Sequence, residues 1–461
     1  MGNLDQARRV RTVSTLLRTL AIGFAVLTPP HPGFAAGTAD DGWPVETVVM
    51  LSRHGVRPPT NGAKFAALSA SPWPSWPVPD GQLTPHGRDA MVLMGEFYRQ
   101  RYVSAGLLPS QGCPPADTLF VWADVDQRTR ATGDALLAGL APGCGRKAGF
   151  RAGGGDDPLF DPIGAGVATL DPAIARRDML AAMGGSIEAM RERWDPQLAA
   201  LGRLLGCCGE ALCRAQVGRP DCAFQELPWA IEVKPNGRKV GLSGPLDDAS
   251  GVTELFRMEY DEGFPPDQVA WGRASTPVAI TSLMALHKAK YDVVERVPYI
   301  ARHGASMLLS QIRIALAQGT DTAPSDAGNG AGPPPAAMTV FVGHDTNLAE
   351  LGSLLGLHWS LAGSQEDDTP PGGALVFERL RNPADGRRHV RVSFMAQTMD
   401  QVRLLAPLTG PGAAGPFVAS VPVPGCASMP GTETPCTLAD FEAFSNDRID
   451  REATTIPDYR P

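Results

Sequence analysis

The sequence has no long apolar run beyond its first residues, no excess of positive charge and no visible repeat. After residue 36 no segment reaches the ~18 consecutive apolar residues of a membrane-spanning helix, so we expect no membrane association of the mature chain. Lys and Arg number 41 against 49 Asp and Glu, a net charge of −8, which argues against nucleic-acid binding. With 461 residues, 43% of them hydrophobic, the chain can form a large α/β domain with an insertion.

The N-terminus has the features of an export signal. Several arginines precede a short apolar run over residues 20–27, and small residues follow at 33–36. The run is shorter than the ~20 residues that span a bilayer, so a cleaved secretory signal over residues 1–36 is favoured over a membrane anchor. The pair Arg8-Arg9 leaves twin-arginine export as the weaker alternative.

Export changes the interpretation of the eight cysteines. An oxidising compartment favours disulfides, and no cysteine pair has the short spacer, combined with a histidine pair, that structural zinc sites use, so we expect no metal. Sequence alone leaves many pairings open. Short loops favour Cys213–Cys222 and Cys426–Cys436, which leaves Cys113–Cys144. Cys207 and Cys208 can bond to each other, stay free, or displace the partners assigned to Cys213 and Cys222.

Three short apolar runs, over residues 46–52, 119–123 and 338–342, each end in polar residues. Their composition is typical of buried parallel strands. In open α/β sheets, ligands bind outside the carboxyl ends of the strands. We therefore expect the three loops that follow these strands to converge on one crevice.

The stretch from about Leu170 to Ala289 is predicted to be mostly helical. Apolar residues recur at spacings of three and four from Ile187 to Leu205, and the pattern resumes over Ser282 to Lys290. A cysteine-rich loop at 207–222 interrupts it. We interpret this stretch as a helical insertion into the α/β domain.

The chemistry concentrates directly after the first strand, where Arg53 and Arg57 flank His54. Arginine presents planar donors that match phosphate oxygens, and an imidazole can attack phosphorus. The flanking cations also disfavour protonation, so His54 keeps the lone pair that a nucleophile needs. We expect a locally positive pocket in this acidic chain. A second Arg-His-Gly triplet at 302–304 has no strand before it, and we interpret His303 as an ordinary helix-start residue.

Five segments together resemble the histidine acid phosphatases, most closely the periplasmic phytases of enteric bacteria. The resemblance runs in order over nearly the whole mature chain. It implies an α/β/α sandwich of the phosphoglycerate-mutase type over residues 37–168 and 296–461, a mostly helical cap domain over 169–295, and a periplasmic location. The segments are 53–59, 123–130, 138–142, 342–347 and 369–378.

The resemblance also implies roles for individual residues, with no cofactor and no metal. His54 is expected to be the nucleophile that forms a phosphohistidine, and Asp345 the general acid. The three family disulfides have the spacing of the pairs favoured above. The residues expected to bind the phosphoryl group are Arg53, Arg57, Arg128 and His344. The residues expected to contact the rest of the substrate are Thr60, Asp124, Glu254, Arg302 and Thr346.

The implied activity is release of phosphate from phytate (myo-inositol hexakisphosphate) at acid pH. Gly55, Val56 and Thr346 follow the phytase pattern, whereas Asn61 stands where the best-known enteric phytase has a lysine, and Lys64 lies further along. A glucose-1-phosphatase or a broad-specificity acid phosphatase is the alternative. A phosphomutase is less favoured because of the export signal, and a non-catalytic phosphate-ester binding protein because nucleophile and acid are both present. We expect a small phosphomonoester as the partner, no nucleic acid, and a monomer.

Overall fold

A mixed β-sheet lies at the centre of the fold in this computed structural model, which describes residues 42–321, 331–426 and 435–460. The predicted signal over 1–36 lies outside these residues. The strands are β1 (Val45–Arg53), β2 (Leu119–Ala123), β3 (Gly149–Phe150), β6 (Met338–Gly343), β7 (Ala374–Arg381), β8 (Arg388–Ala396), β9 (Phe417–Ser420) and β10 (Cys436–Thr437). Their order is β10-β8-β7-β1-β6-β2-β3, and β9 pairs with β8. The neighbours β1, β6, β2 and β3 are parallel, and β7 to β10 join them by antiparallel pairing.

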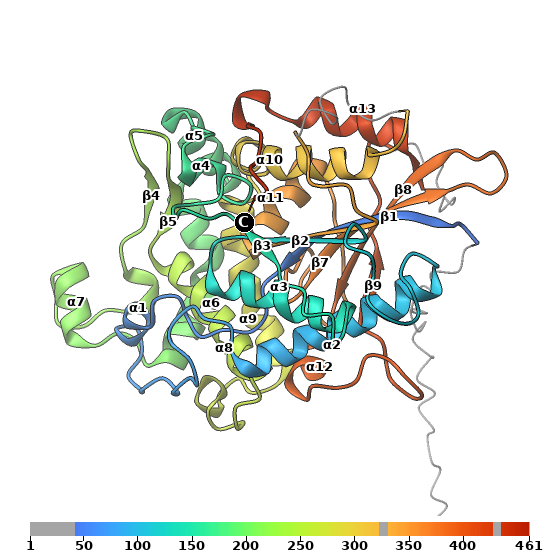
Figure 1. The fold of residues 1–461 in the computed structure, drawn as a ribbon. Helices are drawn as coiled ribbons and strands as arrows, with labels where there is room; N and C mark the ends of the chain where they lie inside the picture. Colours follow the sequence, from blue (N-terminus) through green and yellow to red (C-terminus); the bar gives the residue numbers. More distant parts are fainter. Residues whose placement is uncertain (1–41, 322–330, 427–434, 461) are drawn as a thin grey trace, which may run out of the picture. The chain divides into compact units, whose positions relative to one another are not determined.

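Alternate side chains of β1 point to opposite faces of the sheet, and each face is covered by helices. Val49 and Leu51 belong to the core under α10, α11 and α13, whereas Val48 and Met50 belong to the core over α2 and α3. Figure 1 shows these helices on the two sides of the sheet. The predicted α/β/α sandwich is therefore confirmed. The helices are α2 (Pro85–Ser104), α3 (Gln127–Leu140), α10 (Pro298–Ala317), α11 (Asp345–Leu355) and α13 (Leu438–Arg448).

A third apolar core lies among the helices between β3 and α10, where the sequence predicts a mostly helical insertion. This segment also contains a two-stranded sheet that helical periodicity does not predict, formed by β4 (Ala230–Val233) and β5 (Val240–Ser243). The domain limits at 169 and 295 stay a prediction. The helices are α4 (Pro162–Ala165), α5 (Pro172–Ala182), α6 (Ile187–Leu205), α7 (Glu210–Val217), α8 (Pro245–Asp261) and α9 (Pro277–Val293); elsewhere lie α1 (Gly62–Ala66) and α12 (Met399–Arg403).

Helix α10 starts earlier than the prediction for His303 requires. Pro298 is its first residue, a position where a missing backbone N–H costs no hydrogen bond, so His303 lies in the second turn rather than at the start. The His303 Nδ1 atom lies 2.9 Å from the carbonyl oxygen of Tyr299, one turn back, and Nε2 lies 3.6 Å from Asp450. Across the described helices, none is both long and apolar enough to cross a bilayer.

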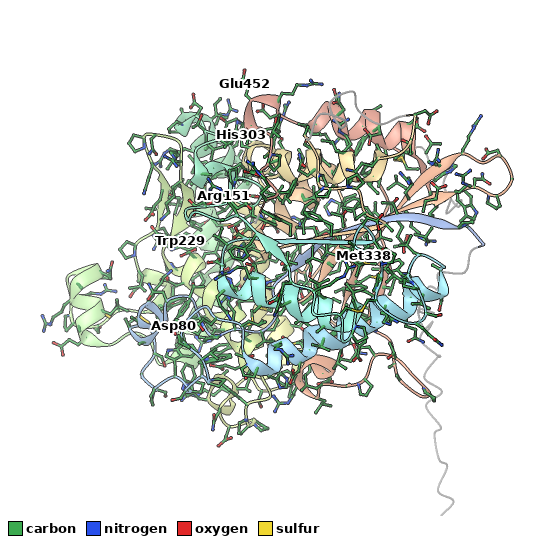
Figure 2. All side chains as sticks on the ribbon, in the orientation of Figure 1. Asp80, Arg151, Trp229, His303, Met338 and Glu452 are labelled. Carbon is green, nitrogen blue, oxygen red and sulfur yellow. A yellow bond between two sulfur atoms is a disulfide. The ribbon has the colours of Figure 1, made fainter. Side chains whose placement is uncertain are left out.

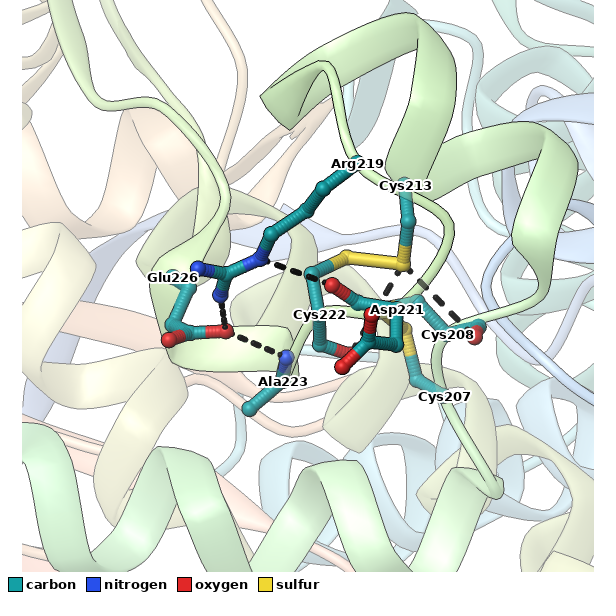
Figure 3. The surroundings of a disulfide bond; sticks show 8 residues. All are labelled: Cys207, Cys208, Cys213, Arg219, Asp221, Cys222, Ala223 and Glu226. Atoms are coloured by element: carbon teal, nitrogen blue, oxygen red, sulfur yellow. Dashed lines mark hydrogen bonds and ion pairs between the residues drawn. A yellow bond between two sulfur atoms is a disulfide. The ribbon is translucent and has the colours of Figure 1, made fainter.

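All eight cysteines are paired. The three predicted disulfides are present, and Cys207 bonds to its neighbour Cys208. Figure 3 shows this bond beside Cys213–Cys222, with the Cys213 sulfur 3.7 Å from the Cys208 carbonyl oxygen. The alternatives in which Cys207 and Cys208 stay free or displace other partners are therefore wrong for this structure.

Candidate active site

The loops after β1, β2 and β6 meet at one edge of the sheet. These strands are adjacent and parallel, and Arg53 lies opposite Gly343 in their register. Two backbone hydrogen bonds continue the pairing past the strand ends, from the His54 N–H to the Gly343 oxygen (3.0 Å) and from the Asp124 N–H to the Val342 oxygen (3.0 Å). The predicted convergence of the three loops is confirmed.

His54 is a buried imidazole whose two nitrogens have different surroundings. Its Nδ1 atom lies 2.8 Å from the Gly55 carbonyl oxygen. Because a carbonyl only accepts, Nδ1 carries the hydrogen and the lone pair is on Nε2. Burial, followed by the charges of Arg57, Arg53 and Arg128, holds the pKa of His54 well below its usual range. The ring is therefore neutral and able to act as a nucleophile.

Two arginines lie beside this imidazole. The Arg57 Nε atom is 3.5 Å from His54 Nε2, and its Nη1 donates to the Pro58 oxygen (3.0 Å). Burial and the charges of Arg53 and Arg128 lower the pKa of Arg57 to about 10, which reflects how closely the cations are grouped. Arg128 lies in the first turn of α3, with Nη2 2.5 Å from Asp126 and 3.4 Å from the Nδ1 atom of His344. The structure thus brings Arg128 to this cluster and also gives it a carboxylate partner.

His344 faces His54 across the cluster. The two ring centroids are 5.6 Å apart, with the planes inclined at 68°. The His344 Nε2 atom lies 2.7 Å from Asp124 Oδ2, and the backbone N–H of His344 donates to Asn347 at the start of α11. Asp124 is buried and orients His344 through this contact, whereas the family resemblance predicts that it contacts the substrate.

Arg53 is fully buried and binds protein groups rather than facing the cavity. Its Nη1 donates to the Thr369 carbonyl oxygen (2.6 Å), and Nη2 lies 2.6 Å from Glu254 and 2.8 Å from Asp345. Burial raises the pKa of Asp345, but Arg53 and then His287 outweigh it, and the pKa lies well below its usual range. In the same way Arg257 and Arg53 outweigh burial and lower the pKa of Glu254 to about 2.

A cavity of ≈ 230 Å³ opens next to these groups and has two walls. The strand-end wall consists of the loop after β1 and the start of α11, with Arg57, Thr60 and Asp345. The helical wall consists of α1, α8 and α9, with Lys64, Asp247, Ser250, Glu254, His287 and Lys290. The two walls together carry three cations and three carboxylates, which are Arg57, Lys64 and Lys290 and Asp247, Glu254 and Asp345. The expected positive charge is therefore concentrated around His54 and does not extend over the helical wall.

Three residues of the helical wall, on α9, are missed by sequence reasoning. His287 Nδ1 lies 3.0 Å from the Ser250 hydroxyl, and the ring stacks on Tyr291 with centroids 4.3 Å apart. Lys290 lies beside them and pairs with Glu295. In the sequence these residues appear only as a polar face of an otherwise apolar helix. Many helices have such a face without any catalytic or binding role.

The remaining predicted residues divide into two groups. Thr60 lines the cavity, and Thr346 follows Asp345 in the first turn of α11. Arg302 lies exposed on α10 and does not line the cavity. Asp80 marks the position of α1, because it accepts a hydrogen bond from the backbone N–H of Gly62 at the start of that helix (2.7 Å). Figure 2 shows His303, the neighbour of Arg302, well away from Asp80. Of the predicted site residues, Arg302 is the one that the fold does not bring to the others.

A larger cavity, of ≈ 1340 Å³, lies at the opposite edge of the sheet. Its lining includes Thr47, Thr118 and Ala337, at the amino ends of β1, β2 and β6, and none of the predicted catalytic residues. Ligands of open α/β sheets bind at the carboxyl ends of the strands, where the smaller cavity lies. The smaller cavity is therefore the candidate active site.

Comparison with known proteins places this arrangement among relatives. The family model of the histidine phosphatase superfamily (branch 2) matches residues 44–201 and 249–395. Phytase AppA of Escherichia coli is 36% identical over 437 residues, covering 94% of this chain and 98% of that protein. A glucose-1-phosphatase of Salmonella typhimurium is 32% identical over 401 residues, covering 85% of this chain and 90% of that protein. The Hafnia alvei phytase in complex with myo-inositol hexakis sulphate superposes with a TM-score of 0.79 at 36% identity, covering 90% of this chain and 100% of that chain.

Proposed function

This chain belongs to branch 2 of the histidine phosphatase superfamily and is a phosphomonoester hydrolase, and on that premise we propose that it is a phytase that acts through a phosphohistidine at His54. The state of His54 carries the proposal. The ring is buried and uncharged, Gly55 holds its Nδ1 hydrogen, and its Nε2 lone pair lies beside Arg57. A phosphoryl group bound by the arginines meets that lone pair.

In the first step the Nε2 atom of His54 attacks phosphorus and the ester P–O bond breaks. The electron pair leaves with the alcohol oxygen, which takes a proton from Asp345. Arg57 and Arg128 balance the negative charge on the phosphoryl oxygens, and Asp124 keeps His344 oriented beside them. The negative charge of a bound phosphate opposes the field of the arginines, so we expect substrate binding to raise the pKa of Asp345 and supply the acid form.

In the second step water attacks the phosphohistidine. Asp345, now ionised, takes a proton from this water, the P–N bond breaks, and its electron pair returns to Nε2. Inorganic phosphate leaves and the enzyme is restored. Arg53 positions the Asp345 side chain, since its Nη2 atom lies 2.8 Å from Asp345 Oδ2.

Phytate is the proposed substrate. Support comes from the phytases among the relatives, from the pattern Gly55, Val56 and Thr346, and from cations on both walls of the cavity. The similarity to a glucose-1-phosphatase keeps that activity as the second candidate. We also propose that the chain is exported to the periplasm, supported by the predicted signal and by four disulfides, which form in oxidising compartments.

The test compares phosphate release from phytate, glucose-1-phosphate and p-nitrophenyl phosphate over pH 3–8, with and without chelator. His54→Ala is the test variant, and His303→Ala, in the second Arg-His-Gly triplet, is the matched control. We expect a higher kcat/KM for phytate than for the other two and no effect of chelator. We expect no turnover by His54→Ala, because alanine has no nucleophile to form the phosphohistidine. We expect full activity of His303→Ala.

A rapid-quench experiment with ³²P-labelled substrate checks the intermediate directly. The wild-type protein and His303→Ala are expected to trap an acid-labile, base-stable phosphoenzyme, and His54→Ala none. Faster turnover of glucose-1-phosphate than of phytate would move the protein to the second candidate. A fully active His54→Ala would disprove the mechanism.

A further inference from the structure

Lys64 is a cation of the helical wall that is already neutralised by two carboxylates. Its Nζ atom lies 2.9 Å from Asp247 Oδ2 and 2.8 Å from Asp248 Oδ1, both in the first turn of α8. Lys64 and Asp247 line the same cavity as Arg57 and Asp345. Lys64 therefore shares a cavity with Arg57 and Asp345 but does not contact them.

The backbone that carries Lys64 is held in place, while its ammonium group is accessible. The Asn61 side chain accepts a hydrogen bond from the Lys64 N–H (3.1 Å), and the Trp73 indole donates to the Phe65 oxygen (3.0 Å). Gly251 leaves room on α8 for the Phe65 ring, because a Cβ atom there would lie 2.6 Å from it. The packing of Phe65 on Gly251 places α1 against α8.

The exposure of the ion pairs separates Lys64 from Lys290, the other lysine of the cavity. The Lys64 side chain is 42% exposed and its partners Asp247 and Asp248 are 27% and 14% exposed, whereas Lys290 and its partner Glu295 are 15% and 9% exposed. Ion pairs that water reaches contribute little net stability, so an arriving anion can compete for them. A lysine ammonium on its flexible stem has three donors that can be redirected.

We propose that Lys64 is a second phosphate-binding residue, which binds another phosphate of a substrate already held at His54, in competition with Asp247 and Asp248. This inference rests on the proposed function. A monoester with a single phosphate has no group to offer Lys64, so the lysine acts on substrates that carry several phosphates. Asp247 and Asp248 limit the affinity that Lys64 adds for such a substrate, because they pair with its ammonium group and repel the phosphate.

The experiment measures kcat and KM on phytate and on p-nitrophenyl phosphate for Lys64→Met, Lys64→Arg and the double variant Asp247→Asn/Asp248→Asn. Lys288→Met is the matched control, since Lys288 pairs with Asp292 at 2.8 Å on α9 and does not line the cavity. For Lys64→Met we expect a rise of about tenfold in KM for phytate with kcat little changed, and no change on p-nitrophenyl phosphate. Lys64→Arg restores the phytate KM, and the double variant lowers it about threefold.

Calorimetric binding of myo-inositol hexakis sulphate gives a readout that needs no turnover. Weaker binding by Lys64→Met, with Lys288→Met unchanged, supports the inference even where activity is altered. An unchanged phytate KM and unchanged sulphate binding in Lys64→Met would overturn it, as would equal loss on both substrates or a higher phytate KM in the double variant. A wild-type protein that hydrolyses none of these esters would instead overturn the proposed function.

Discussion

The two walls of the cavity differ in how firmly their charges are held. Behind the strand-end wall, Arg53 and His54 follow directly from β1, and their backbone N–H groups donate to Gly373 and Gly343. On the helical wall, Lys64 and Asp247 form an ion pair that water reaches. Catalytic groups must keep their geometry, whereas groups that select a substrate can exchange partners. We therefore assign the chemistry to the first wall and substrate selection to the second.

Helix α8 repeats this contrast in two buried glutamates. Glu254, at the cavity, is paired with Arg53 and Arg257, and its pKa is lowered to about 2. Glu259 forms no ion pair with any residue that the structure describes, accepts one hydrogen bond from the Ala270 N–H (2.9 Å), and burial raises its pKa to about 8. At neutral pH Glu254 is therefore ionised and Glu259 is mostly protonated, because Glu254 lies beside the arginines.

The largest effect is expected from Asp345→Asn on the strand-end wall. Loss of the proton donor lowers kcat by about 10²–10⁴-fold on an alkyl phosphate, whose alkoxide leaves poorly, and much less on p-nitrophenyl phosphate. Phosphate binding is expected to survive, which inhibition by inorganic phosphate measures. Wild-type turnover of the alkyl phosphate by this variant would show that Asp345 is not the acid.

A smaller effect is expected from Arg57→Met, which keeps the length of the side chain and removes its charge. Loss of one phosphoryl-binding group lowers kcat/KM on every substrate by about 10²-fold. After burial, Arg57 is the largest influence that lowers the pKa of His54, so this pKa rises in the variant and activity is lost at a higher pH on the acid side. Arg302→Met, an exposed arginine on α10, is the control. An equal loss of kcat/KM in Arg57→Met and Arg302→Met would contradict the assignment of phosphoryl binding to Arg57 alone of these two arginines.

The smallest effects are expected on stability, from Glu259→Gln and Glu254→Gln. Glu259 has a raised pKa in the fold, so its stabilising contribution is present below about pH 4.5 and is lost as pH rises toward about 8. Glu254 has a lowered pKa, so its contribution is present above about pH 4.5 and is lost as pH falls toward about 2.

Thermal midpoints measured from pH 3 to 8 check this pair of variants. Glu259→Gln is expected to lose less stability than the wild type between pH 5 and 8, and Glu254→Gln to lose less between pH 5 and 3. Identical pH profiles for both variants would contradict the contrast between the two glutamates.

Much of the strand-end wall could be predicted from the sequence. Short apolar runs that end in Arg53, Asp124 and Gly343 are local patterns, and the rule that parallel strands end at one edge brings their loops together. The pairs Cys213–Cys222 and Cys426–Cys436 follow from proximity in the chain. Resemblance to the family added Asp345 and Glu254, which no local pattern identifies. Pro298 marks the start of α10, because proline is favoured at the first position of a helix, and the Arg-His-Gly triplet lies within the helix rather than at its start.

The sequence by itself determined the three strands over residues 46–52, 119–123 and 338–342 and the polar residues at their ends, because periodicity and turn chemistry act between near neighbours. The sandwich followed from the family resemblance. Only the tertiary structure decided which way individual side chains turn. It buried Arg53 between two carboxylates, directed Asp124 to His344, left Arg302 outside, and paired Lys64 with α8. These contacts join residues far apart in the chain, and they depend on the packing of whole helices against the sheet rather than on any local pattern.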